Sequence, residues 1–219
     1  MFAALGHGRS YGAHSLFLGR RLPGILESGL WRQLASLPPA PTRGLITDVG
    51  NDILYGFPAE RIVAWVEEAV DRLQRITDDV ILTDLPLASI GRLSAAKFLL
   101  FRSVIVPRCR LSLEQVAGVA GRVNDGLCAL ATARGLSLRH LREDWYGVDP
   151  IHIRPPLWRP AWREILLGDA EGAAVGEASH REGLRLYFMR PERRWLLGRE
   201  QITPQRGVRL KAGARIWLY

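Results

Sequence analysis

The strongest constraint on the fold is the alternation of short apolar runs with helical patterns through the first 170 residues. Short runs rich in Val, Ile and Leu are typical of buried strands, whereas apolar residues at every third or fourth position indicate helices. Strands separated by helices favour a mostly parallel sheet with helices on both faces. The expected strands are 2–5, 16–22, 44–49, 80–83 and 136–141, and the expected helices are 25–37, 58–76, 93–106, 112–135 and 158–167.

The pattern changes after about Gly168, where short alternating runs are separated by Pro and Gly. Such runs predict hairpins, so we expect an α/β domain over residues 1–168 and a basic, β-hairpin-rich extension over 169–219. Residues 169–180 are the expected linker. The extension holds most of the net charge of +8, because residues 181–219 contain ten Arg or Lys and three Glu. The expected hairpin strands are 183–189, 194–197, 208–211 and 215–219.

Arginines that alternate with apolar residues favour the solvated face of a hairpin. A contact of this basic extension with an acidic surface or another subunit stays open. The sequence carries no nucleic-acid-binding motif, so we expect no nucleic acid partner.

The cysteine content and the hydropathy indicate a compartment for the protein. Cys109 and Cys128 are the only cysteines, and their spacing suits neither a disulfide framework nor a metal site. No stretch reaches the roughly 18 apolar residues of a membrane span, and we expect no signal peptide before the first motif, which begins at Gly6. We therefore expect a cytoplasmic protein with two free cysteines.

Two polar motifs follow expected strands. In the sequence Asp149-Pro-Ile-His152, a carboxylate three residues before an imidazole is suited to hold the ring in one tautomer. Asn51, in the turn Gly50-Asn51-Asp52, offers an amide donor to a developing oxyanion, and Asp52 is expected to bond loop amides. Because ligands bind at the carboxyl ends of parallel strands, one cleft is expected to hold both motifs.

In their order along the chain, these motifs resemble the SGNH (GDSL-type) hydrolase family over residues 2 to about 168. The resemblance implies a three-layer α/β/α sandwich with a mostly parallel, flavodoxin-like sheet, and hydrolysis of carboxylic esters without a metal or cofactor. It also implies that His152 is the general base, that Asp149 orients it, and that Gly24 and Asn51 form the oxyanion hole. The small-molecule substrate is then an ester.

The first motif, Gly6-His7-Gly8-Arg9-Ser10-Tyr11-Gly12, departs from the family pattern. An ungapped alignment puts Gly8 at the nucleophile position, and glycine has no side chain to attack with. A two-residue slip makes Ser10 the nucleophile, which gives the Asp149/His152 pair a hydroxyl to deprotonate. The sequence therefore predicts either a Ser-His-Asp esterase or a repurposed, catalytically inactive protein that binds an anionic ligand.

Two further residues of this motif have two interpretations. His7 and Arg9 are either exposed loop residues or contacts for an anionic part of the substrate, since a guanidinium matches carboxylate and phosphate groups.

Overall fold

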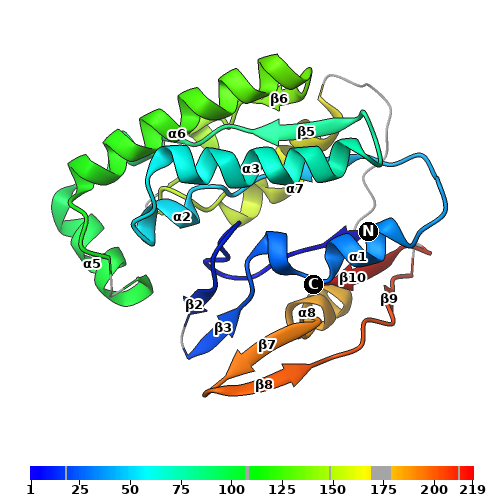
Figure 1. Ribbon diagram of the computed structural model, residues 1–219. Coiled ribbons are helices and arrows are strands. Elements are labelled where there is room, and N and C mark those ends of the chain that lie inside the picture. The colour runs from blue at the N-terminus through cyan, green and yellow to red at the C-terminus, as the bar shows by residue number, and fades with distance from the viewer. Residues whose placement is uncertain (18, 107–108, 148, 169–178, 212) are drawn as a thin grey trace. The chain divides into compact units, whose positions relative to one another are not determined.

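The computed structural model describes residues 1–17, 19–106, 109–147, 149–168, 179–211 and 213–219 (Figure 1). The chain divides into two compact units. The first, here called the α/β unit, is Pro39–Gly172, and the second, the terminal unit, combines Met1–Pro38 with Ala173–Tyr219. Residues 1–38, expected in the α/β domain, thus belong with the C-terminal segment. Of the expected linker, 169–180, residues 169–178 lie outside the described residues.

The α/β unit is built on a three-stranded parallel sheet with the order β4-β5-β6. Its strands are β4 (Gly44–Ile46), β5 (Val80–Thr83) and β6 (Ser137–Arg139). Parallel strands alternating with helices confirm the expected α/β character of the chain. The helices of this unit are α2 (Asn51–Leu54), α3 (Ala59–Gln74), α4 (Leu87–Gly91), α5 (Ala95–Ile105), α6 (Leu113–Arg134), η2 (Glu143–Trp145), η3 (Pro155–Leu157) and α7 (Trp158–Leu167).

Local signals set the ends of the long helix α6. Ser112 accepts a hydrogen bond from the backbone N–H of Gln115, whose side chain accepts one from the backbone N–H of Ser112. This capping box satisfies amide donors that the first turn of a helix leaves without partners. Gly135 ends the helix with φ of 64°, a left-handed conformation that favours glycine.

The core of the α/β unit forms where α3 and α6 pack on each other and on the strands. Helix α3 buries Ile62, Val66 and Val70, which follow one another at intervals of four residues and so share one face. The central strand β5 is buried along its whole length. A second cluster joins Trp145 and Tyr146 to Ala161 and Ile165 of α7. Together these contacts hold the strand ends and the loops that follow them.

The terminal unit contains two further sheets. One has the order β2-β3-β7-β8 and is antiparallel, and the other has the order β1-β10-β9 with β1 parallel to β10. Strands from both ends of the chain therefore pair with each other. The elements of this unit are β1 (Phe2–Ala3), β2 (Ser15–Phe17), β3 (Arg20–Leu22), η1 (Ile25–Glu27), α1 (Leu30–Ala35), α8 (His180–Tyr187), β7 (Arg193–Leu196), β8 (Arg199–Ile202), β9 (Val208–Arg209) and β10 (Arg215–Leu218).

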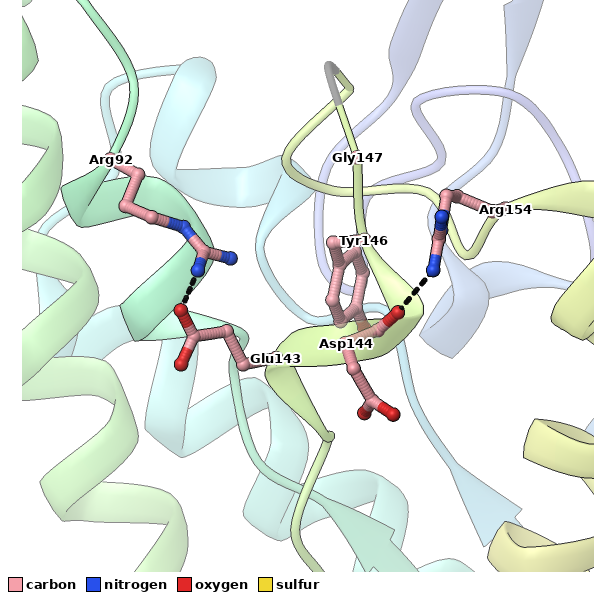
Figure 2. A pocket seen from close by; sticks show the side chains of 6 residues that line it. All are labelled: Arg92, Glu143, Asp144, Tyr146, Gly147 and Arg154. Carbon is pink, nitrogen blue, oxygen red and sulfur yellow. Dashed lines mark hydrogen bonds and ion pairs between the residues drawn. The ribbon is translucent and has the colours of Figure 1, made fainter.

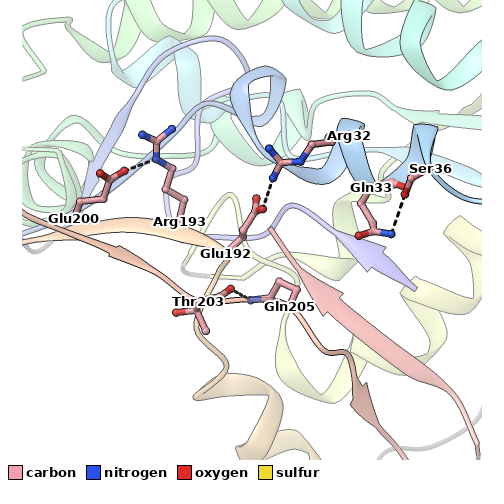
Figure 3. A network of polar contacts seen from close by, with 8 residues as sticks. All are labelled: Arg32, Gln33, Ser36, Glu192, Arg193, Glu200, Thr203 and Gln205. Atoms are coloured by element: carbon pink, nitrogen blue, oxygen red, sulfur yellow. Dashed lines mark hydrogen bonds and ion pairs between the residues drawn. The ribbon is translucent and has the colours of Figure 1, made fainter.

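Polar contacts also join the two ends of the chain within the terminal unit. Figure 3 shows Arg32 of α1 beside Glu192, with Nη2 and Oε1 2.8 Å apart. Glu192 in turn donates its backbone N–H to Leu218 O at 3.0 Å. These contacts hold the N-terminal helix beside the segment that precedes β7.

Two expectations for the terminal unit need correction. Of residues 183–189, expected as a strand, 183–187 belong to helix α8, which begins with a capping box of Ser179 and Glu182 and ends at the C-cap Phe188. The expected strand 16–22 is instead the two antiparallel strands β2 and β3. The hairpin of β7 and β8 agrees with the expectation for 194–197.

Candidate functional site

The carboxyl ends of the three parallel strands carry the polar groups of the α/β unit. Thr47 and Asp48 follow β4, Asp84 follows β5, and His140 follows β6. A hydrogen bond of 2.9 Å between the hydroxyls of Thr83 and Thr47 links the ends of β5 and β4. In a parallel α/β sheet this edge is where ligands bind.

Asp149 and His152 lie close together, as their spacing predicts. Nδ1 of His152 lies 2.7 Å from Oδ2 of Asp149. The other carboxylate oxygen accepts the backbone N–H groups of Ile151 at 3.0 Å and His152 at 3.2 Å. A carboxylate next to Nδ1 favours the tautomer with its proton on Nδ1, and this leaves Nε2, across the ring, as the basic nitrogen.

The pair shifts the titration of both partners. The hydrogen bond that His152 donates to Asp149 is the main reason why the pKa of His152 is raised above 6.5; desolvation opposes this shift, and the charges of Asp149 and Asp48 add to it. The pKa of Asp149 is lowered. Desolvation acts to raise it, but the hydrogen bonds that Asp149 accepts from His152 and Ile151 outweigh the effect of desolvation. The side chains of His152 and Asp149 are 62% and 42% exposed, so solvent reaches the imidazole.

Asn51, the expected oxyanion donor, bonds to Asp48. Its Nδ2 lies 3.3 Å from the carbonyl oxygen and 3.4 Å from Oδ2 of Asp48. Asp48 has φ of 61°, which is uncommon outside glycine. Desolvation raises the pKa of the Asp48 carboxyl group, against the charge of His152 and the hydrogen bond from Asn51, which both lower it. Asp52 is fully buried at the start of α2, in keeping with a structural role.

Ser10 is fully buried, with an exposed fraction of 0%, and its Oγ accepts the backbone N–H of Ala13 at 2.8 Å. Its carbonyl accepts the N–H of Ile25 at 3.0 Å. Gly8 has φ of 64°, so a side chain at this position would strain the backbone. The hydroxyl of Ser10 thus helps to hold its own loop, and Gly8 suits the conformation of the turn.

Gly24 lies against the same loop. A Cβ atom at this position would meet the carbonyl oxygen of Tyr11 and the carbonyl carbon of Gly12, each at 3.0 Å. The carbonyl of Gly24 accepts the N–H of Glu27 at 3.0 Å. Close backbone packing therefore requires glycine here, independently of any oxyanion.

The structure places Arg9 as an internal anchor of the terminal unit. Its guanidinium donates to the carbonyls of Pro23 at 3.1 Å and Leu5 at 3.2 Å, and also to that of Tyr219. Burial, with a smaller effect of Arg20, lowers the pKa of Arg9 to about 10, and Glu192 opposes this shift. These contacts explain Arg9 without an anionic ligand.

His7 remains exposed and stacks on Phe17, with ring centroids 5.5 Å apart. The seven expected site residues divide between the units. Asn51, Asp149 and His152 belong to the α/β unit, and His7, Arg9, Ser10 and Gly24 belong to the terminal unit.

A second aspartate and histidine pair was not expected from the sequence. Nδ1 of His140 lies 2.7 Å from Oδ2 of Asp84, and Oδ1 of Asp84 accepts the N–H of Leu141 at 2.7 Å. The position of Asp84 directly after one expected strand, and of His140 near the end of another, was the available signal. Tyr146 lies near the same edge, and burial, aided by the charges of Asp48 and Asp84, raises its pKa.

A hollow of about 580 Å³ lies beside the His152 loop. Figure 2 shows Tyr146 between Arg92, which is paired with Glu143, and Arg154, which is bonded to the backbone of Asp144. The hollow is lined by Arg92, Glu143, Asp144, Tyr146, Gly147 and Arg154.

Within the described ranges, no group of three or more His, Cys, Asp or Glu side chains is arranged to hold a metal ion. No described helix is both long and apolar enough to cross a membrane. Cys109 and Cys128 are free.

Comparison of the chain with models of known protein families found no match, and comparison with curated proteins found none either.

Proposed function

We propose that the chain is an SGNH-like hydrolase that cleaves a carboxylic ester, with the family resemblance extending over residues 2 to about 168. The three-layer sandwich is part of this proposal, and the parallel sheet of β4, β5 and β6 supports it. The observation that carries the proposal is the contact of 2.7 Å between Asp149 and His152 beside the carboxyl edge of that sheet. This geometry suits a general base.

In the proposed reaction, His152 takes the proton of Ser10 while the hydroxyl oxygen attacks the ester carbonyl. Asn51, Gly24 and backbone amides stabilise the oxyanion. His152 then gives the proton to the leaving alcohol, and water hydrolyses the resulting acyl-enzyme. The long hydrogen bonds between Asn51 and Asp48, at 3.3 and 3.4 Å, are weak enough to exchange for one to the oxyanion. The reaction requires the hydroxyl of Ser10 to donate its hydrogen to Nε2 of His152.

The alternative is a repurposed SGNH-fold protein that binds an anionic ligand without cleaving it. Two observations favour it: Ser10 Oγ is buried and accepts the N–H of Ala13, and Gly8 occupies the ungapped nucleophile position with φ of 64°. In this case His152 is a ligand contact and not a base.

A fluorophosphonate probe separates the two functions, because it labels only an activated serine. We expect labelling at Ser10, its loss in Ser10→Ala and His152→Ala, and full labelling in Ser137→Ala, which changes an exposed serine of β6. Hydrolysis of short p-nitrophenyl esters should follow the same order. If the folded protein takes up no label and cleaves no ester, the hydrolase proposal fails and the binding function is favoured.

The basic terminal unit supports a contact with an acidic surface. Residues 1–38 and 173–219 hold 14 Arg or Lys and 5 Glu, whereas residues 39–172 hold 16 Arg or Lys and 17 Asp or Glu. Like charges disfavour pairing of two terminal units, so we propose an acidic surface in place of another subunit. Sedimentation with anionic vesicles at low salt, and its loss at high salt, tests this contact.

We also propose a cytoplasmic location, because the free Cys109 and Cys128 suit a reducing compartment. Fractionation of the native host tests it.

A further inference from the structure

We propose that the hollow beside His152 binds an oxyanion group, a carboxylate or a phosphate, through Arg154 with support from Arg92. That the ester substrate carries such a group rests on the proposed hydrolase function. That the hollow binds such a group rests on the α/β unit alone.

The hollow adjoins the segment that carries Asp149 and His152. Gly147, in its wall, donates its N–H to the carbonyl of Asp149 at 3.4 Å. Arg154, also in the wall, donates its N–H to the carbonyl of Trp145 at 2.9 Å. The loop with His152 therefore begins and ends at the hollow. A volume of about 580 Å³ is sufficient for a small molecule.

The acidic residues of the wall are already paired. Glu143 forms an ion pair with Arg92. Both carboxylate oxygens of Asp144 accept hydrogen bonds from Arg142, at 3.0 and 2.9 Å, which is the main reason why the pKa of Asp144 is lowered. Figure 2 shows the Asp144 carboxylate turned away from Arg92 and Arg154. These pairings reduce the repulsion that an entering anion would meet.

Arg154 has a different environment. Its Nη2 donates to the backbone carbonyl of Asp144 at 2.7 Å, and in the described part of the chain its guanidinium forms no ion pair. A carbonyl oxygen bears no net charge, and although the charge of Arg154 contributes to the lowered pKa of Asp144, that carboxylate is hydrogen-bonded to Arg142 and not to Arg154. The guanidinium can therefore bind an entering anion. A guanidinium has five N–H donors in a planar fork, which matches the oxygens of a carboxylate or phosphate.

Gly147 sets the path of the Arg154 side chain. A Cβ atom at Gly147 would lie 3.1 Å from Cδ and 3.4 Å from Cγ of Arg154. The stem of Arg154 therefore lies against the glycine, and in Gly147→Ala the side chain of Arg154 must shift by a few tenths of an ångström while its charge is kept.

Calorimetric titration of the full chain at low ionic strength tests binding without any need for activity. The ligands are inorganic phosphate and succinate, and the variants are Arg154→Gln, Arg154→Lys, Gly147→Ala and the control Arg163→Gln on the exposed face of α7. We expect binding to weaken about tenfold or more in Arg154→Gln, as for loss of a charge-assisted hydrogen bond, and less in Arg154→Lys. Gly147→Ala should also bind more weakly, and Arg163→Gln should bind as the parent does.

Circular dichroism on each variant verifies that it is folded. If neither anion binds the parent, or if a folded Arg154→Gln and a folded Arg154→Lys both bind with unchanged affinity, the anion site is wrong. Tighter binding of succinate assigns a carboxylate, and tighter binding of phosphate assigns a phosphate.

A pair of esters then separates this inference from the hydrolase proposal. Under the inference, p-nitrophenyl hemisuccinate is cleaved with a lower KM than the neutral p-nitrophenyl butyrate, and Arg154→Gln removes the difference. Cleavage of both with equal KM overturns the anionic substrate and leaves the hydrolase intact. Phosphate binding that depends on Arg154, without cleavage of either ester, retains the anion site and rejects the hydrolase.

Discussion

His140 and Asp84 form the same contact as His152 and Asp149: Nδ1 lies 2.7 Å from Oδ2 in both pairs. The partners differ in sequence separation, which is 56 residues in the first pair and three in the second. The first pair also has the more buried carboxylate, since Asp84 is 13% exposed and Asp149 is 42% exposed. The edge of the sheet thus presents two imidazoles, each oriented by a carboxylate.

Single substitutions decide which histidine acts as the base. We expect His152→Ala to lower kcat/KM for a p-nitrophenyl ester by about 10²–10⁴-fold, the usual effect of a general base. His140→Ala is the matched control, and its rate should equal that of the parent protein. The opposite pattern of rates would assign the reaction to Asp84 and His140 instead.

The pH dependence reports the state of His152. A general base acts when it is unprotonated, so kcat/KM should rise with pH through an apparent pKa above 6.5, because Asp149 raises the pKa of His152. Asp149→Asn should move this midpoint down toward 6.5. An unchanged midpoint in the variant would show that another group controls the rate.

The same shift in pKa connects pH with folding. Because the pKa of His152 is higher in the folded chain, its protonated form stabilises the fold fully below about pH 6.5. This stabilisation is lost as the pH rises through the folded-state pKa. Urea unfolding of His152→Ala and the parent protein should therefore differ more at pH 5 than at pH 9.

Two glycines of α6 provide a matched test of helix packing. A Cβ atom at Gly126 would lie 2.5 Å from Cγ2 of Val63 in α3, whereas one at Gly121 meets no atom within 4 Å. We expect Gly126→Ala to lower the free energy of unfolding by about 1–3 kcal/mol through overpacking. Gly121→Ala should raise it by about 0.5–1 kcal/mol, because alanine is the better helix former. Urea denaturation measures both, and equal stability of the two variants would contradict the close packing of α3 and α6.

The buried Arg9 should determine the stability of the terminal unit. Arg9→Met keeps an apolar stem but leaves the carbonyls of Pro23, Leu5 and Tyr219 without their donor. We expect a loss of about 1.5–3 kcal/mol, as for hydrogen bonds to a charged group. Thermal unfolding should show this loss, and Arg206→Met, at an exposed arginine, should leave the transition unchanged. A small effect of Arg9→Met would instead favour the contact with substrate that the sequence left open.

The sequence by itself determined the features that depend on neighbouring residues. The spacing of Asp149 and His152 predicted their contact, because a three-residue turn brings the two side chains together. Likewise, Ser112 with Gln115, and Gly135, predicted both ends of α6. These signals can be recognised in the sequence because their geometry is fixed within one or two turns of the chain.

The tertiary structure alone decided the contacts between distant segments. The pairing of β1 with β10, the bond from Arg9 to Tyr219 and the contact of His140 with Asp84 each join residues far apart in the sequence. It also decided that Ser10 Oγ lies buried against Ala13. Such contacts depend on how whole strands and loops bury apolar surface and satisfy their backbone groups together, and local patterns of residues do not encode that choice.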